Sequence, residues 1–234
     1  MDDFKRQYRD PLFSIIVPCK KVNGDVLKCV WECENLPQNK EIFLVTDNTC
    51  PGYPAEKRNW AMERAKGDFL AFLDSDSYPS RDWLTNTLIH FEAGFSGVCG
   101  PGIIPAGSSI LEHASDWVYR LMPYSYRVVP KSQRIVTEFP TFNLVVKRES
   151  APRFKDYLTG EDSLFCRELK GLILYDPKVV VYHKRRKMFK PFWKQVRTYG
   201  LHRGHLIRLA VLGYGSTVLV YGTNFIKGFL KKRL

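Results

Sequence analysis

The sequence predicts an α/β domain with a mainly parallel sheet flanked by helices, and three observations support this prediction. Short apolar runs alternate with helical patterns of about a dozen residues, a length that suits crossover connections between parallel strands. The first three runs lead into proline or aspartate, so polar residues should gather at one edge of the sheet. The 234 residues, 44% hydrophobic and 26% charged, are enough for one sizeable core.

The expected elements follow one another regularly in the N-terminal part of the chain. Short apolar runs bounded by turn residues predict buried strands at Phe13–Val17, Glu41–Thr46, Phe69–Leu73 and Ser96–Cys99. Stretches with helical patterns predict helices at Asp25–Leu36, at Pro54–Ala65, and at Arg81–Phe91 with Ser80 as its cap. Strands separated by helices in this way predict βαβ units.

The C-terminal part differs from the rest in charge. Pro177–Leu234 holds 14 of the 36 Lys and Arg residues and no Asp or Glu, within a net charge of +12. Lys184–Lys194 interleaves basic and aromatic residues, and Leu209–Ile226 has 18 residues without a charge. We therefore expect a domain at 1–183 and a basic, amphipathic helical segment at 184–234 that lies on an anionic membrane surface. The alternatives are a solvated basic face over an ordinary helix and, less favoured, a nucleic-acid site.

The N-terminus and the cysteines indicate a reducing compartment. Met1–Arg6 is charged and has no apolar core, unlike a secretory signal. The six cysteines have no paired metal-ligand spacing, so we expect free thiols, with Cys29 and Cys33 as packing residues one helical turn apart. The expected location is the cytoplasmic face of a membrane, where the chain would be peripheral or weakly integral.

The third expected strand leads directly into two carboxylates, Asp74 and Asp76. If the extended geometry continues past Leu73, both side chains point to the same side, because side chains alternate along a strand. Like charges at short range repel unless a cation lies between them, and a hard divalent ion is the obvious candidate. The alternative is that Asp74, Ser75 and Asp76 only form a turn or a cap.

Several ordered motifs resemble those of the family 2 glycosyltransferases, which have the GT-A fold, a Rossmann-like α/β architecture. They span roughly residues 13–183 and comprise Phe13–Pro18, Val45–Asn48, Arg58–Asn59, Ala65–Asp76 and Gly160–Asp162. The resemblance implies that a sugar is transferred with inversion from a nucleotide diphosphate donor, assisted by Mg²⁺ or Mn²⁺. A divalent cation suits this chemistry because negative charge develops on the leaving diphosphate.

The resemblance also implies roles for single residues on the donor side. Pro18 and Asp47 would line the nucleotide pocket, with Asp47 accepting hydrogen bonds from the base. Arg58 would approach the diphosphate. Asp74 would bind the ribose or the metal, and Asp76 the metal directly.

Two further residues could complete the donor side. His183 resembles the histidine that completes the metal site in some relatives, and the alternative is that it only caps a buried strand. Arg197 lies where processive relatives carry a Q-x-x-R-W motif. Lys194 and Thr198 replace the Gln and the Trp of that motif, so a processive polymerase is not expected, whereas Arg197 could still contact the diphosphate.

An acceptor hydroxyl needs a base, and Asp162 is the candidate; catalysis would require partial desolvation or a nearby carboxylate, such as Glu161, to raise its basicity. Thr159–Asp162 also has the spacing of a capping box with Thr159 as the N-cap, and a helix N-terminus favours the carboxylate and lowers its basicity. In relatives the preceding stretch borders the acceptor pocket, which would place Thr141 and Asn143 near the sugar. The alternative is an edge strand with incidental polar side chains.

The expected function is metal-dependent, inverting transfer of one sugar to a hydroxyl, on a lipid-linked saccharide. One rival is transfer to a polyprenyl phosphate, which is already ionised and needs no base. A rival of another class is a non-catalytic basic module that binds membrane or nucleic acid. The donor sugar, the nucleotide and the acceptor stay open, because a few contacts from variable loops decide them.

Overall fold

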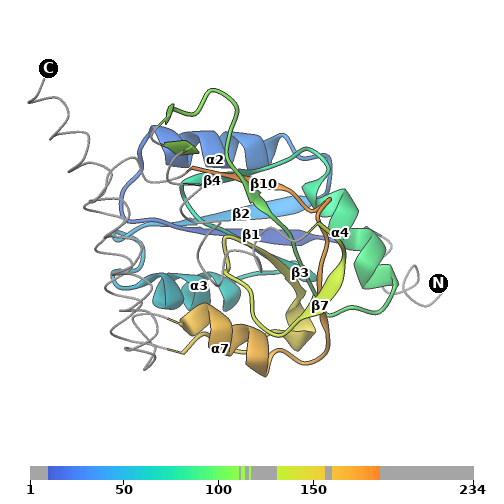
Figure 1. Cartoon of the computed structure of the whole chain (residues 1–234). Coiled ribbons are helices and arrows are strands. Elements are labelled where there is room, and N and C mark those ends of the chain that lie inside the picture. Colours follow the sequence, from blue (N-terminus) through green and yellow to red (C-terminus); the bar gives the residue numbers. More distant parts are fainter. Residues whose placement is uncertain (1–9, 111, 114–115, 117–130, 156–159, 185–234) are drawn as a thin grey trace, which may run out of the picture. The chain divides into compact units, whose positions relative to one another are not determined.

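The computed structural model describes residues 10–110, 112–113, 116, 131–155 and 160–184. Its central sheet has seven strands in the order β2-β1-β3-β8-β5-β9-β7, and Figure 1 shows β2, β1 and β3 side by side. In that order they are Lys40–Val45, Phe13–Pro18, Phe69–Leu73, Asn143–Lys147, Gly97–Cys99, Ile173–Tyr175 and Arg134–Val136. A second sheet has the order β4-β10-β6, which are Ser77–Pro79, Val181–His183 and Gly102–Ile103. The helices are α2 (Gly24–Glu34), α3 (Pro54–Met62), α4 (Trp83–Glu92) and α7 (Glu161–Glu168), and Arg148–Ser150 is a 3₁₀ turn.

The central sheet is mixed. β1 pairs in parallel with β2 and β3, as expected for βαβ units. β8 runs antiparallel to both β3 and β5, β9 runs parallel to β5, and β7 runs antiparallel to β9. The prediction of a mainly parallel sheet therefore holds for strand direction, since β2, β1, β3, β5 and β9 run the same way and only β8 and β7 run the other way. Strand direction depends on how the chain returns to the sheet, which an apolar run does not encode.

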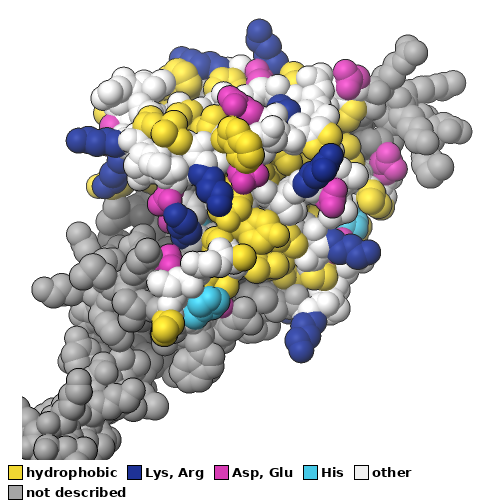
Figure 2. Space-filling view, turned by 90° about the horizontal axis from the view of Figure 1, so that it is seen from above, with side chains coloured by type: hydrophobic (Ala, Val, Ile, Leu, Met, Phe, Trp, Pro, Cys, Tyr) yellow, Lys and Arg dark blue, Asp and Glu magenta, His cyan; other side chains and the backbone are white. Residues whose placement is uncertain are grey.

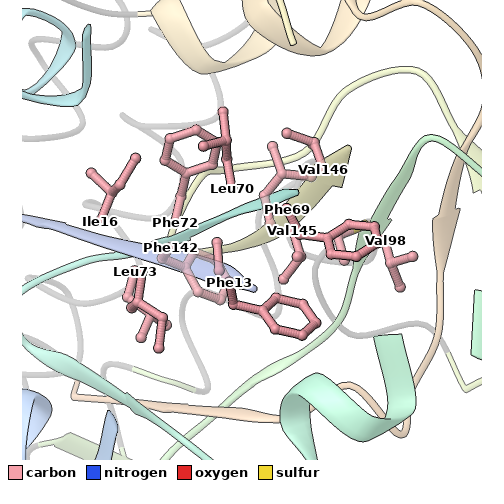
Figure 3. Close-up of a cluster of buried hydrophobic side chains, with 14 of the residues drawn as sticks. Phe13, Ile16, Phe69, Leu70, Phe72, Leu73, Val98, Phe142, Val145 and Val146 are labelled. Carbon is pink, nitrogen blue, oxygen red and sulfur yellow. The ribbon is translucent and has the colours of Figure 1, made fainter. Parts of the chain in front are cut away.

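The core lies on both faces of this sheet, and β3 shows why. Successive side chains of a strand point to opposite faces. Phe69 stacks between Phe13 and Phe91 of α4, with ring centroids 5.1 and 4.5 Å away. Phe72, on the other face, makes edge contacts of 5.3 and 5.5 Å with Phe154 and with Phe165 of α7. Figure 3 shows the buried side chains that β1, β3, β5 and β8 contribute to this cluster.

The predicted strand at Phe69–Leu73 is confirmed at both ends, and helix α3 begins at Pro54 as predicted, whereas the start of α4 differs from the expectation. Helix α4 begins at Trp83 with Asp82 as its N-cap, so the prediction of Ser80 as the cap is wrong. The backbone N–H of Ser80 instead donates to the carbonyl of Val180 at 3.0 Å, which joins it to the chain before β10. Asn23 caps α2, because its Oδ1 accepts from the N–H of Val26 at 3.0 Å.

Helix α7 also starts differently. Its N-cap is Gly160, with φ of +85°, a left-handed conformation that glycine adopts without strain. The predicted capping box with Thr159 as N-cap is therefore wrong, and Thr159 itself lies outside the described residues. Oδ1 of Asp162 accepts from the N–H of Ser163 at 2.8 Å.

The surface of the described part mixes both signs of charge. Figure 2 shows Lys and Arg side chains interspersed with Asp, Glu and hydrophobic residues on the face seen from above. None of the helices in the described ranges is both long and apolar enough to cross a membrane. The expected segment 184–234 lies outside the described residues except for Lys184, which forms an ion pair with Asp25. All six cysteines are free thiols, and Cys29 and Cys33 are buried, as expected for packing residues.

Candidate functional site

The carboxyl ends of the parallel strands bring three predicted donor-side residues to one edge of the sheet. Pro18 is the last residue of β1, Asp47 follows β2, and Asp74 directly follows β3. Because β1 is parallel to both neighbours, these ends lie side by side. The N–H of Asp47 donates to the carbonyl of Lys20 at 3.2 Å, so the loops after β1 and β2 are joined.

A turn, not continued strand geometry, brings Asp76 back beside Asp74. The N–H and Oγ of Ser77 both donate to the carbonyl of Asp74, at 3.0 and 2.7 Å. The turn reverses the chain into β4, so the expected alternation past Leu73 is wrong, although the carboxylates do converge. Ligand atoms of Asp74, Asp76 and His183 lie within 4.8 Å of one another. The same residues thus form a turn and bring the two carboxylates together as predicted.

His183 reaches this cluster from the second sheet. It is the last residue of β10 and pairs with Ser77 of the antiparallel strand β4. Its Nε2 lies 3.2 Å from Oδ1 of Asp76. The imidazole stacks on Phe142 with ring centroids 4.9 Å apart and planes at 16°. Packing therefore holds the ring in an orientation that faces the carboxylates.

The electrostatics of the cluster fit a bound cation. Burial raises the pKa of Asp74 above its ordinary value, Asp76 adds to the rise, and Arg58 and His183 oppose it. A divalent cation between the two carboxylates would relieve the repulsion between them. The donor set of two carboxylates and one imidazole suits Mn²⁺, and Mg²⁺ has the stronger preference for oxygen alone.

Arg58 connects this cluster to α7. Its side chain is only 4% exposed; it donates to Oδ1 of Asp74 at 3.2 Å and to Oε1 of Glu161 at 3.4 Å. The guanidinium carbon lies 5.4 Å from the ring centre of Phe154. Its Nε is buried with no hydrogen-bond partner within the described ranges. One cation thus joins the end of β3 to the first turn of the helix that carries Asp162.

The predicted acceptor-side residues have different surroundings. Asp162 is partly buried in the first turn of α7, beside Glu161. Thr141 is buried, and Asn143 is fully buried. The amide of Asn143 accepts from Trp83 Nε1 at 2.8 Å and donates to the carbonyls of Pro101 and Val179 at 3.2 and 2.8 Å.

These contacts bear on what Asn143 can do. It belongs to β8, which lies between β3 and β5, so the alternative of an edge strand is wrong. Its amide group already has three protein partners, which is what a buried polar side chain requires. The acceptor contact expected for Asn143, like that for Thr141, stays a prediction.

Sequence reasoning missed Lys57. Its side chain is 3% exposed, and its Nζ lies 2.7 Å from Oδ1 of Asp47 and 2.5 Å from the carbonyl of Gly52. Arg58 and Asn59, the next two residues, are also buried, and the Asn59 side chain bonds to the N–H and carbonyl of Phe154 at 2.9 and 2.8 Å. A run of polar residues in a helix usually marks a solvated face, so this pattern carried no signal for burial.

The comparisons with known proteins agree with these observations. The family model described as glycosyl transferase family 2 matches residues 51–153, which include Arg58, Asp74 and Asp76. A Methanococcus voltae protein, dolichyl N-acetyl-alpha-D-glucosaminyl phosphate 3-beta-D-2,3-diacetamido-2,3-dideoxy-beta-D-glucuronosyltransferase, is 26% identical over 259 residues. That match covers 91% of this chain and 78% of that protein. The chain is a glycosyltransferase, and its residues 51–153 match family 2.

This glycosyltransferase is also similar to WfaP of Escherichia coli, a UDP-Glc:alpha-D-GlcNAc-diphosphoundecaprenol beta-1,3-glucosyltransferase. The match is 39% identical over 64 residues, which cover 26% of this chain and 24% of WfaP. Among solved structures it resembles S. aureus TarS 1-349 in complex with UDP-GlcNAc, with 15% identity and a TM-score of 0.54. That alignment covers 81% of this chain and 65% of the TarS fragment, so the chain spans less than two thirds of the fragment.

A second solved structure, A197 from STIV, is 18% identical with a TM-score of 0.51, over 75% of this chain and 86% of that one. At these identities the structural likeness concerns the fold alone, and the fold is the α/β GT-A type expected from the motifs. Arg197, the remaining predicted donor residue, lies outside the described residues.

Proposed function

We propose that this glycosyltransferase moves one sugar, with inversion and with the help of a divalent cation, from a nucleotide diphosphate sugar to a hydroxyl of a lipid-linked saccharide. The observation that carries the proposal is Arg58, which contacts both the Asp74 side of the acidic cluster and Glu161 beside Asp162. Two relatives support the acceptor class, since their names refer to a dolichyl phosphate-linked sugar and a diphosphoundecaprenol-linked GlcNAc.

On the donor side, the proposal gives each residue a separate task. Asp74, Asp76 and His183 would hold Mg²⁺ or Mn²⁺, which when bound supplies positive charge against the leaving diphosphate. Arg58 would add a second positive charge, and Arg197 a third from the C-terminal segment. Pro18 and Asp47 would line the pocket for the nucleoside. UDP-sugars are the first donors to test, because the WfaP and TarS descriptions name UDP-Glc and UDP-GlcNAc.

On the acceptor side, Asp162 would take the proton from the attacking hydroxyl. The hydroxyl oxygen then bonds to the anomeric carbon from the side opposite the diphosphate, which leaves with the bonding electrons and inverts the configuration. The ion pair between Glu161 and Arg58 supports this role, because it fixes the first turn of α7. Thr141 and Asn143 belong to the proposal as neighbours of the acceptor.

A panel of nucleotide sugars tests the proposal. We expect one UDP-sugar to raise the melting temperature of the full chain by a few degrees with Mn²⁺ and not without it. Transfer to a short-chain prenyl diphosphate saccharide should then follow by mass spectrometry. If no UDP- or GDP-sugar gives metal-dependent transfer or hydrolysis, and Asp76→Ala leaves nucleotide binding unchanged, the chain is a non-catalytic binding module.

The location is tested separately from the chemistry. We propose that residues 184–234 bind the anionic cytoplasmic face of a membrane, since their charge is entirely basic. The full chain should cosediment with vesicles that contain anionic lipid and not with neutral ones, and deletion from Lys184 onward should abolish this. Vesicle binding that survives the deletion contradicts the membrane role of the segment.

A further inference from the structure

Lys57 is a buried cation that is held rigidly. Its Nζ contacts Oδ1 of Asp47 at 2.7 Å and the carbonyl of Gly52 at 2.5 Å. Gly52 has φ of +130°, and a Cβ there would lie 1.7 Å from an Oε of Glu56, so the loop closes tightly on the first turn of α3. That Oε also accepts from the N–H of Tyr53 at 2.5 Å. These contacts therefore fix the position of the ammonium group beside Asp47.

In contrast to Lys57, Asp47 has an exposed side chain. Its side chain is 45% exposed, and its backbone is tied to the loop after β1 through Lys20. Oδ1 is the atom that binds Lys57, whereas Oδ2 has no hydrogen-bond partner among the residues that the structure describes. The carboxylate thus presents one oxygen to an incoming ligand and keeps the other on the lysine.

The number of carboxylate oxygens that can accept a hydrogen bond affects which base of a nucleotide sugar is recognised. Uracil offers one ring N–H between two carbonyl oxygens, and a single carboxylate oxygen can accept it. Guanine offers a ring N–H beside an exocyclic NH₂, and the two donors match both oxygens of a carboxylate. Adenine and cytosine have no ring N–H on this edge. Oriented donors and acceptors of this kind discriminate strongly, because an unmatched polar group stays without a partner.

We propose that Lys57 determines base specificity: by holding Oδ1 of Asp47 it leaves one acceptor oxygen for the base and so selects uridine over guanosine diphosphate sugars. The inference rests on the proposed function, in which Asp47 meets the base of the donor. Lys57 acts through Asp47 and is a positioning residue. Its buried stem and its bond to Gly52 give the carboxylate a fixed direction, which a mobile surface lysine would not provide.

Calorimetric titration of the full chain with Mn²⁺ and nucleoside diphosphates tests this inference. The wild type should bind UDP about tenfold or more tightly than both GDP and 3-methyl-UDP, which lacks the ring N–H. In Lys57→Met both oxygens of Asp47 are released, and the preference for UDP over GDP should fall about tenfold. Lys57→Arg keeps a cation at this position and should retain most of the preference.

Lys155→Met is the matched control, because Lys155 also forms an ion pair with a carboxylate, that of Glu168, but is exposed. It should leave all affinities unchanged. If Lys57 were only structural, Lys57→Met would weaken UDP and GDP equally, and an unchanged ratio would overturn the inference. If Lys57→Met does not fold, the wild type decides: equal affinity for UDP and 3-methyl-UDP overturns it.

The experiment also separates this inference from the proposed function. A wild type that binds GDP more tightly than UDP in the presence of Mn²⁺ contradicts the role of Lys57 and leaves the glycosyl-transfer proposal intact. A wild type that binds no nucleoside diphosphate contradicts both.

Discussion

Two aspartate–histidine pairs in this molecule have the same chemistry and different surroundings. Nε2 of His183 lies 3.2 Å from Asp76, and Nε2 of His90 lies 2.5 Å from Asp176. The Asp76 side chain is 46% exposed in the turn after β3, whereas that of Asp176, after β9, is 3% exposed.

In the pair of His90 and Asp176, groups of the protein itself supply the hydrogen bonds that the carboxylate accepts. Burial works to raise the pKa of Asp176, but hydrogen bonds from the backbone of Lys178, from His90 and from Gln133 lower it below its ordinary value. The first pair is different, because Asp76 stands beside a second carboxylate, Asp74, whose pKa is raised by burial and by this neighbour.

The difference separates a buried carboxylate, whose partners all lie within the fold, from an exposed one that lies beside a second acid. The bonds of Asp176 join α4, the chain before β7 and the end of β9, so they stabilise the fold. Two adjacent acids at the exposed end of a strand gain nothing for stability from their proximity, and such groups mark functional sites.

The largest expected effect is on the exposed pair. Asp76→Asn should lower the rate of sugar transfer about 10³-fold or more, because it removes a charged ligand of the proposed metal site. The melting temperature should stay nearly unchanged, since the side chain is about half exposed. Initial rates over a Mn²⁺ titration measure the loss of transfer, and thermal unfolding measures the melting temperature. A variant with the wild-type rate contradicts the metal site.

The next effect concerns the proposed base. Asp162→Asn should lower transfer about 10²- to 10³-fold while leaving nucleotide affinity unchanged, because only the proton acceptor is lost. Glu168→Gln, in the last turn of the same helix, is the control and should be fully active. Undiminished transfer by Asp162→Asn favours the rival acceptor, a polyprenyl phosphate that needs no base.

The buried pair should show the opposite pattern. Asp176→Ala leaves His90 and Gln133 without their shared acceptor and should reduce the free energy of unfolding by about 2–3 kcal/mol. The rate of the folded fraction should stay within about twofold of the wild type, since Asp176 has no proposed part in transfer. Urea unfolding and initial rates test both statements. A large loss of rate without a loss of stability makes this pair functional.

The smallest effect is on pH dependence. The pKa of Asp176 is lowered in the folded state, so its contribution to stability is present above the unfolded pKa of about 4 and is lost as the pH falls through the folded value. The wild type should therefore lose stability on acidification more steeply than Asp176→Asn. Unfolding free energies of both proteins at a series of acidic pH values give this difference, and equal slopes would show that Asp176 does not contribute.

The sequence alone was sufficient for the first half of the domain. β1, β2 and β3 are short apolar runs between turn residues, and their order predicts parallel pairing because the connections are helices. Pro18, Asp47 and Asp74 then lie at one edge of the sheet by topology alone. The family motifs pointed to the same residues, and the family assignment is confirmed by the comparisons.

The partners of the side chains could be seen only in the tertiary structure. Sequence analysis made no prediction for Lys57 and expected Asn143 to contact the acceptor. Both are buried, and helix and strand patterns do not say which polar residues the core encloses. Arg58 contacts Glu161, which is 103 residues away in the sequence, and His183 contacts Asp76, which is 107 residues away. Local sequence determined which elements form and which edge of the sheet carries the chemistry. Long-range packing decided which groups meet there, because a contact between distant residues depends on every element that folds between them.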